Sequence, residues 1–224
     1  MFGDIDLWQV STYVVPVLLG ITLHEAAHGW VAWKLGDDTA YVRGRVSFNP
    51  FRHIDPVGTI LLPAMLIIAR AGFIFGWARP VPVRFGNLRH PKRDMVLVAA
   101  AGPLANVVLA VAAGVLLHVV PLFTGGIAAW LDQTLRIGIF INLLLAVFNM
   151  LPLPPLDGGR VAVGLLPPSL GMPLARLERY GTLILLLILI GLPLLLPSVN
   201  LFQSIILPIT GALYNVVTIV TGHI

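Results

Sequence analysis

Long apolar stretches, separated by short clusters of charged and turn-forming residues, dominate the chain. A helix that crosses a bilayer needs about 20 mostly apolar residues. Five stretches reach such a length, and a sixth is ambiguous because Pro63, Arg70, Gly72 and Gly76 interrupt it. The pattern predicts an all-α polytopic membrane protein with five to six transmembrane helices, at about residues 10–35, 57–77 (the ambiguous stretch), 95–120, 135–151, 181–197 and 202–222.

The basic residues favour five spans over six. They gather in three clusters, which follow the first stretch, precede the stretch at 95–120 and follow the stretch at 135–151. Basic loops prefer the cytoplasmic side of a membrane. All three clusters become cytoplasmic if residues 57–77 form a re-entrant hairpin, with the N-terminus outside and the C-terminus inside. The alternative is six simple spans with a weak charge bias.

Two short stretches alternate partly between apolar and polar residues, which is typical of strands. They are YVRGRVSF at 41–48 and PVPVRF at 80–85. Pro80 and Pro82 restrict the second stretch to an edge or an irregular strand. The sequence therefore predicts short β-strands at the membrane surface.

Composition supports the membrane class and limits the chemistry. Hydrophobic residues make up 58% of the chain and charged residues 11%, whereas soluble domains carry about 25% charge. We attribute the net charge of +4 to basic residues in cytoplasmic loops beside the lipid bilayer. We therefore expect no nucleic-acid partner. There is no cysteine, so any metal must be bound by histidines and carboxylates.

Residues 24–28 read His-Glu-Ala-Ala-His and match the H-E-x-x-H pattern inside the first apolar stretch. Residues four apart share one helix face, so His24 and His28 can reach a single zinc ion. Glu25 can then approach a water molecule as a general base. Ionisable groups within a membrane helix are rare and usually functional, although a polar patch between helices is the alternative. Counting back from Lys34 places the motif roughly 9–15 Å below the cytoplasmic edge.

A third ligand must come from elsewhere, because catalytic zinc usually has three protein ligands and one open position. Asp157 is the best candidate, since the proline-rich run at 152–155 ends the preceding helix and the glycine pair at 158–159 permits a sharp turn. An ordinary turn or helix cap is the competing role for this carboxylate. His53 and Asp55 remain alternative ligands.

Several separated motifs, in this order, resemble the site-2 protease family of intramembrane zinc metalloproteases, and in particular its compact prokaryotic members. The resemblance covers about residues 18–161. The motifs that carry it are HEAAH at 24–28, GRVSFNP at 44–50, HIDPVGT at 53–59, AGPLAN at 101–106, and the run from Asn149 through PPLDGG at 154–159.

This resemblance implies a zinc metalloendopeptidase that carries out regulated intramembrane proteolysis on transmembrane protein substrates. It implies one Zn²⁺ per chain, bound by His24, His28 and Asp157, with Glu25 as the general base. Asn106 and Asn149 would support the substrate or the oxyanion. An unwound substrate segment would pair with a strand made of Gly44, Arg45, Val46, Ser47 and Phe48.

The resemblance also implies a single intramembrane metalloprotease domain over residues 1–224. Its catalytic core would span about 10–161, with additional C-terminal helices at about 181–222. We expect a multi-pass protein of a prokaryotic plasma membrane whose active site lies towards the cytoplasmic side.

Overall fold

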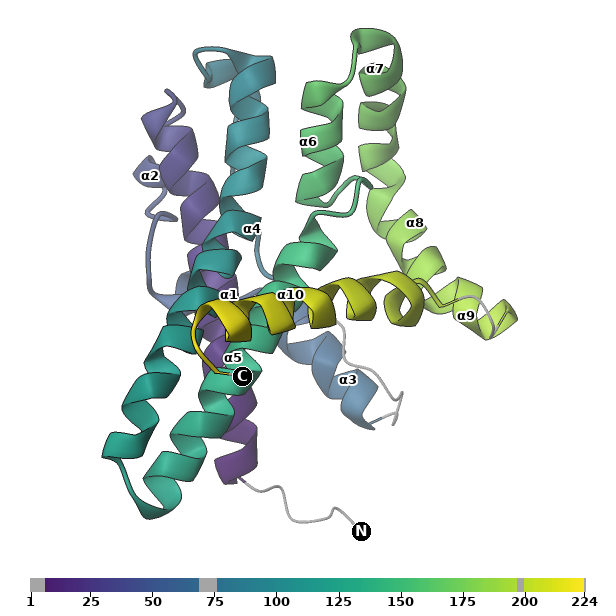
Figure 1. Cartoon of the computed structure of the whole chain (residues 1–224). Helices are drawn as coiled ribbons and strands as arrows, with labels where there is room; N and C mark the ends of the chain where they lie inside the picture. The colour runs from purple at the N-terminus through teal and green to yellow at the C-terminus, as the bar shows by residue number, and fades with distance from the viewer. Residues whose placement is uncertain (1–6, 69–75, 197–199, 224) are drawn as a thin grey trace.

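The centre of the molecule is a group of three long helices that pack against one another. The computed structural model describes residues 7–68, 76–196 and 200–223, and within these residues it contains helices and no strands. The three central helices are α1 (Leu7–Lys34), α4 (Pro91–Leu116) and α5 (Gly125–Asn149). Each contacts the other two (Figure 1). Their shared interface is the frame on which the candidate site is built.

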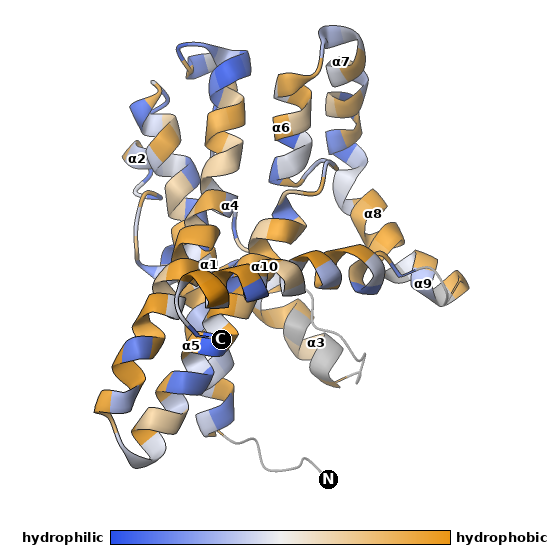
Figure 2. Cartoon of the chain, in the orientation of Figure 1, coloured by the Kyte–Doolittle hydropathy of each residue, from blue (hydrophilic) through white to orange (hydrophobic). Residues whose placement is uncertain are grey.

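Four helices in the described residues are long and apolar enough to cross a membrane: Leu7–Lys34, Pro91–Leu122, Gly125–Asn149 and Phe202–Val220. Many large apolar side chains on these helices are exposed, and the helices consist largely of hydrophobic residues, orange in Figure 2. Leu104 in α4 is 63% exposed, for example. Soluble monomers rarely expose apolar patches of such extent, whereas lipid accommodates them. The chain is therefore an all-α integral membrane protein. Four candidate spans lie in its described residues, and the predicted total of five to six stays a prediction.

The two ends of the ambiguous stretch after Asp55 contact each other. It begins with a π-helical turn, η2 (Pro56–Leu61), and continues as α3 (Leu62–Ile68). The next residues, 69–75, lie outside the described residues, and they include Arg70 and Gly72. The Trp77 N–H then donates to the Gly58 carbonyl at 3.1 Å, and Thr59 Oγ1 donates to the Trp77 carbonyl at 2.8 Å. The two described ends of this stretch therefore lie next to each other, as a re-entrant hairpin requires.

The structure assigns no strand to either stretch for which one was predicted. Tyr41 and Val42 belong to a short helix, α2 (Thr39–Val42). Residues 44–48 form a loop: Gly44 has a φ of +62°, and the Ser47 carbonyl accepts a hydrogen bond from His53 Nε2 at 2.9 Å. Side chains and turns thus bind backbone groups that a strand ladder would need.

The second stretch, 80–85, also lacks strand pairing within the described part of the chain. Its last residue, Phe85, begins a 3₁₀ turn, η3 (Phe85–Asn87). Pro80 and Pro82 have no N–H to donate, so a regular ladder cannot form across them. The residues before a proline are still biased towards extended backbone. This stretch therefore lacks regular secondary structure before Phe85, and its backbone groups form hydrogen bonds with side chains instead of with a neighbouring strand.

A pair of short helices follows α5 and packs beside α4. These are α6 (Asp157–Leu165) and α7 (Pro168–Arg176), which lie side by side at one end of the molecule (Figure 1). The predicted span at 181–197 is helical from Gly181 to Leu195, as α8 (Gly181–Leu186), a π-helical stretch (Leu187–Gly191) and α9 (Leu192–Leu195) follow one another without a gap. This region is not among the four candidate spans.

The last helix ends beside the connection between α4 and α5. A π-helical turn, η7 (Phe202–Ile206), leads into α10 (Leu207–Val220), which crosses α5. His223 Nε2 donates to the Gly114 carbonyl at 2.8 Å. At the start of α5, Trp130 Nε1 donates to Ser11 Oγ in α1 at 2.8 Å. His223 thus lies near the end of α4, and the start of α5 contacts the first turns of α1. The side of the membrane on which each terminus lies stays a prediction.

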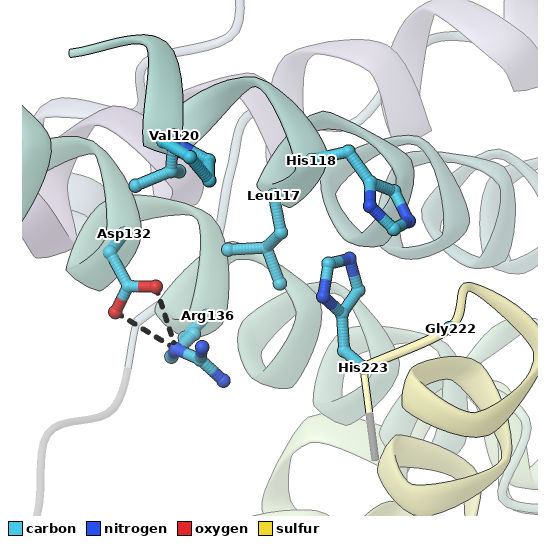
Figure 3. A pocket seen from close by; sticks show the side chains of 8 residues that line it. Leu117, His118, Val120, Asp132, Arg136, Gly222 and His223 are labelled. Carbon is cyan, nitrogen blue, oxygen red and sulfur yellow. Dashed lines mark hydrogen bonds and ion pairs between the residues drawn. The ribbon is translucent and has the colours of Figure 1, made fainter.

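A cavity of about 310 Å³ opens at this end of the bundle. The imidazoles of His118 and His223 face each other on one side of it, with ring centroids 4.2 Å apart (Figure 3). The ion pair of Arg136 with Asp132, at 2.9 Å, lies on the other side. Residue 118 is 16 positions beyond Gly102 along α4 and its continuation, or roughly 24 Å. This cavity is thus separate from the histidine motif.

Candidate active site: a buried two-histidine, one-carboxylate cluster

Three buried side chains from two helices converge between α1, α4 and α6. His24 and His28 lie one turn apart on α1, and Asp157 is the first residue of α6. The two Nε2 atoms are 3.1 Å apart. Asp157 Oδ2 is 3.2 Å from His24 Nε2 and 3.4 Å from His28 Nε2. The three residues that the sequence singled out as ligands therefore meet at one point.

The second nitrogen of each imidazole is already hydrogen-bonded. His24 Nδ1 lies 2.6 Å from Asn106 Oδ1, and His28 Nδ1 lies 2.7 Å from the Val98 carbonyl. Both partners are oxygen acceptors, so both Nδ1 atoms must carry the proton. In neutral imidazoles the Nε2 atoms then present lone pairs towards Asp157 Oδ2. Three lone pairs at such short distances repel one another unless a cation lies between them.

A zinc ion fits this arrangement of donors. Ligand atoms around tetrahedral zinc lie roughly 3.3 Å apart, given bond lengths of about 2.0–2.1 Å, and the observed separations are 3.1–3.4 Å. Asp157 Oδ2 is buried and accepts no ordinary hydrogen bond within the described part of the chain. Imidazole N–H groups that donate to oxygen are also the usual support for metal-binding histidines. His24, His28 and Asp157 would therefore hold the metal and leave a fourth position open.

Asn106 fixes the orientation of the His24 ring through its side-chain amide. It is fully buried, and its Nδ2 donates to Asn142 Oδ1 at 2.9 Å and to the Gly20 carbonyl at 3.2 Å. Asn142 in turn donates to the Gly138 carbonyl, at 2.9 Å. These contacts use both ends of the Asn106 amide, whereas the sequence analysis gave this residue a role beside the substrate. Sequence reasoning missed Asn142, although an amide in the middle of an apolar stretch was a usable signal.

Gly102 allows α4 to approach the two histidines closely. A Cβ at this position would collide with the Nε2 atoms of His24 and His28. Gly158 and Gly159 serve a similar purpose, because a Cβ at either would collide with the backbone of residues 150–154. This glycine pair lies inside α6 and does not make the predicted sharp turn. Close packing of backbone explains these three glycines.

Glu25 lies beside the cluster and contacts a segment far away in sequence. Its Oε2 accepts a hydrogen bond of 2.8 Å from the main-chain N–H of Val81. The Val81 side chain is 9% exposed and packs on α1, where a Cβ at Gly29 would lie 3.1 Å from it. The alternating pattern at 80–85 gave no sign of this contact with the histidine motif.

Three other candidates make hydrogen bonds outside the cluster. Asn149 donates from Nδ2 to the Leu145 carbonyl, at 3.0 Å, one turn earlier in α5. Asp55 caps the π-helical turn that follows it, by accepting from the N–H groups of Val57 and Gly58. His53, which binds the Ser47 carbonyl, supports the 44–48 loop. These contacts are structural, and they leave Asp157 as the carboxylate that meets the two histidines.

An H-E-x-x-H helix that joins a carboxylate from another helix, inside an apolar bundle, defines a membrane-embedded zinc metalloprotease. Comparison with known proteins agrees. The sequence profile of peptidase family M50, the site-2 protease family, matches residues 116–192. The matched region contains Asp157, but it does not include the histidine motif at residues 24–28.

Relatives extend the match over most of the chain. The YwhC protein of Bacillus subtilis (strain 168), named as a zinc metalloprotease, is 39% identical over 90% of this chain and 92% of its own length. The Rip2 protein of Mycolicibacterium smegmatis, also named as a zinc metalloprotease, is 33% identical over 82% of this chain and 70% of its own. No solved structure matches. The chain belongs to peptidase family M50, and it is a zinc metalloprotease.

Proposed function

We propose that this metalloprotease hydrolyses peptide bonds in or near the transmembrane segments of other membrane proteins, as in regulated intramembrane proteolysis. The observation that carries the proposal is the position of the cluster. His24 is ten residues before Lys34, the basic end of α1, which is roughly 15 Å along the helix axis. Both histidines are buried between helices whose outer surfaces are apolar. Peptide bonds that reach this point must come from within the membrane.

Glu25 acts as the general base in this proposal. Its carboxylate is next to the metal ligands along α1, and one oxygen, Oε2, is bound by the Val81 N–H. The other oxygen can accept a proton from the attacking water and later deliver it to the leaving amine. Zinc, when bound, polarises the scissile carbonyl and makes water more acidic. Asn106 keeps His24 in the tautomer that leaves Nε2 free for the metal.

A transmembrane substrate must unwind before its carbonyls become accessible, because a helix uses them in internal hydrogen bonds. Each unpaired peptide group in hydrocarbon costs several kcal/mol. Non-helical backbone beside Glu25 can supply partners. The 44–48 loop provides it, and it is joined to residues 77–84 through Arg45 Nη2, which donates to the Arg79 carbonyl at 2.5 Å. Helix-breaking residues in the substrate would lower the cost of unwinding.

The orientation follows from the basic clusters. Lys34, Arg43, Arg89 and Lys92 lie at the end of the bundle where α1 ends and α4 begins. Basic loops favour the cytoplasmic side. The cluster of His24, His28 and Asp157 therefore lies towards the cytoplasmic side of a prokaryotic plasma membrane. The bilayer and the transmembrane substrate are the partners that this surface requires.

Metal content and cleavage, measured together, test the roles of Glu25 and Asp157. Glu25→Gln should retain about one zinc per chain and lose cleavage by roughly 10²–10⁴-fold, because an amide cannot accept the proton. Asp157→Ala should lose both metal and activity, since only two ligands remain. The assay uses purified protein, elemental analysis and a single-pass peptide substrate in vesicles.

The His24→Ala/His28→Ala double variant is the control for specific metal binding. It should contain no stoichiometric zinc. Zinc retained at one equivalent in this double variant would show that the metal binds elsewhere. Wild-type cleavage by Glu25→Gln would show that another group takes the proton.

A further inference from the structure

A non-helical segment, residues 77–84, lies across α1 and is fastened at both ends. Near its start the Arg79 N–H donates to the His53 carbonyl at 2.9 Å. At its end the Arg84 N–H donates to Asp37 Oδ2 at 2.6 Å. His53 and Asp37 are both fully buried or nearly so, and the segment therefore has fixed anchors.

Arg45 fastens the same segment in the middle. Its Nη2 donates to the Arg79 carbonyl at 2.5 Å and lies 3.4 Å from the Pro80 carbonyl. These are the two peptide groups directly before Val81. The planar guanidinium suits this task, because it presents several donors in a rigid fork. The sequence analysis had placed Arg45 in a strand that binds substrate, whereas its side chain binds the enzyme's own backbone.

Val81 presents the only main-chain N–H of residues 80–82, since both of its neighbours are prolines. That N–H donates to Glu25 Oε2 at 2.8 Å. The Val81 side chain is buried against Gly29, which stops the segment from sliding along α1. The three anchors and this packing converge on a single hydrogen bond to the catalytic carboxylate.

A positioned carboxylate is a better base than one that rotates freely. Hydrogen bonds to ionised groups are shorter and stronger than neutral ones. A bond to Oε2 fixes the plane of the carboxylate and leaves Oε1 to face the water. Positioning of a reacting group within about half an ångström contributes strongly to rate.

We propose that the main-chain N–H of Val81 holds Glu25 in its working orientation, and that Arg45 is the positioning residue that keeps this N–H in place. This inference rests on the proposed role of Glu25 as the general base. It gives residues 77–84 a part in catalysis that is separate from substrate binding. The opposite role, an inhibitory strap that must leave Glu25 before turnover, predicts faster cleavage when the contact is removed.

Val81→Pro tests the hydrogen bond directly, with Val81→Ala as the matched control. Proline removes the N–H and keeps the backbone extended, while alanine keeps the N–H and removes the packing. We expect Val81→Pro to lower kcat by about 10- to 100-fold with zinc content, melting temperature and KM close to wild type. Val81→Ala should stay within about threefold of wild-type kcat. Equal kcat in the two variants, or a higher kcat in Val81→Pro, would overturn the proposal.

Arg45→Gln and Arg45→Lys test the second half of the proposal. Arg45→Gln should lower kcat by about threefold to tenfold and leave KM unchanged, and Arg45→Lys should restore part of the loss, because an ammonium group can still donate to the two carbonyls. In the Val81→Pro background, Arg45→Gln should add little, since residues that act through one contact are not additive. A rise in KM that persists in that background would make Arg45 a substrate-binding residue instead.

The Glu25→Gln variant separates this inference from the function on which it rests. In that background Val81→Pro should have no further effect on residual cleavage. If Glu25→Gln is fully active, the proposed base is wrong. If Glu25→Gln is inactive but Val81→Pro cleaves like wild type, the base stands and the positioning role of Val81 fails.

Discussion

At the scale of single residues, the site depends on which nitrogen of each histidine carries a proton. Asn106 and the Val98 carbonyl each fix an N–H at Nδ1, so both Nε2 lone pairs face the carboxylate of Asp157. The cluster is thereby a receptor for a cation before any metal arrives. Gly102 completes it, because its lack of a side chain makes room for both imidazoles.

Gly102→Ala should disrupt the cluster. The added Cβ would collide with both Nε2 atoms, and the histidines can avoid it only by moving away from Asp157. We expect zinc affinity to fall by at least tenfold, and cleavage with it, as measured by competition with a chelator. Gly211→Ala in α10 is the matched control, because a Cβ there meets nothing within 4 Å. Equal zinc affinity in the two variants would contradict the packing argument.

The sequence identified the ligands more completely than their surroundings. The H-E-x-x-H spacing fixes two ligands and a base on one turn of helix, and the resemblance pointed to Asp157. The contacts from Asn142, the Val98 carbonyl and the Val81 N–H join positions far apart along the chain. Such contacts depend on how helices pack, and neither spacing nor hydropathy encodes that packing in a single sequence.

At the scale of elements, the loops after α1 explain why the strand predictions failed. Asp37, which is fully buried, accepts hydrogen bonds from the Thr39 hydroxyl at 2.5 Å, the Arg84 N–H at 2.6 Å and Asn87 Nδ2 at 3.1 Å. One carboxylate thus ties three segments together. Alternation in 41–48 and 80–85 indicated extended chain, but side chains such as Asp37 and Arg45 took the place of a strand ladder.

The pKa of Asp37 makes this junction sensitive to acid. Burial alone would raise the pKa, but the hydrogen bonds from Thr39, Arg84 and Asn87 outweigh it and hold the pKa below its ordinary value. Because the pKa is lower in the folded state, the ionised carboxylate stabilises the fold at pH values above its unfolded-state pKa, which is about 4. This stabilisation is lost as the pH falls through the folded-state pKa. Asp37→Asn removes the charge and keeps the shape.

We therefore expect Asp37→Asn to lower the melting temperature at neutral pH by roughly 3–10 °C. The difference from wild type should shrink as the pH falls below about 4, where Asp37 of the unfolded chain is protonated first and the folded carboxylate only at lower pH. Thermal unfolding in detergent across pH 3–7 is the measurement. Asp38→Asn, at the neighbouring carboxylate, is the control. A gap between wild type and Asp37→Asn that is constant over this range would contradict the charge-based account.

At the scale of the whole molecule, hydropathy indicated the class of protein, an all-α integral membrane protein, and four of the described helices qualify as spans; the total of five to six stays a prediction. The stretch at 181–197 is apolar enough to resemble a span and is helical from Gly181 to Leu195, with a π-helical stretch in the middle, but it is not among the candidate spans of the described residues. Local composition does not report where a π-helical stretch falls or how α10 crosses α5. The paired ends of the segment around Gly58 and Trp77 agree with the hairpin that the basic clusters favoured.

The position of the cut in a membrane substrate tests the central claim most directly. Wild type and Glu25→Gln are placed in vesicles with a single-pass peptide that carries helix-breaking residues near its cytoplasmic end, and mass spectrometry locates the new termini. The account predicts a cut inside the apolar segment, towards that end, made by wild type and absent with Glu25→Gln. Cleavage confined to the soluble flanks, or the same cut in both proteins, would contradict it.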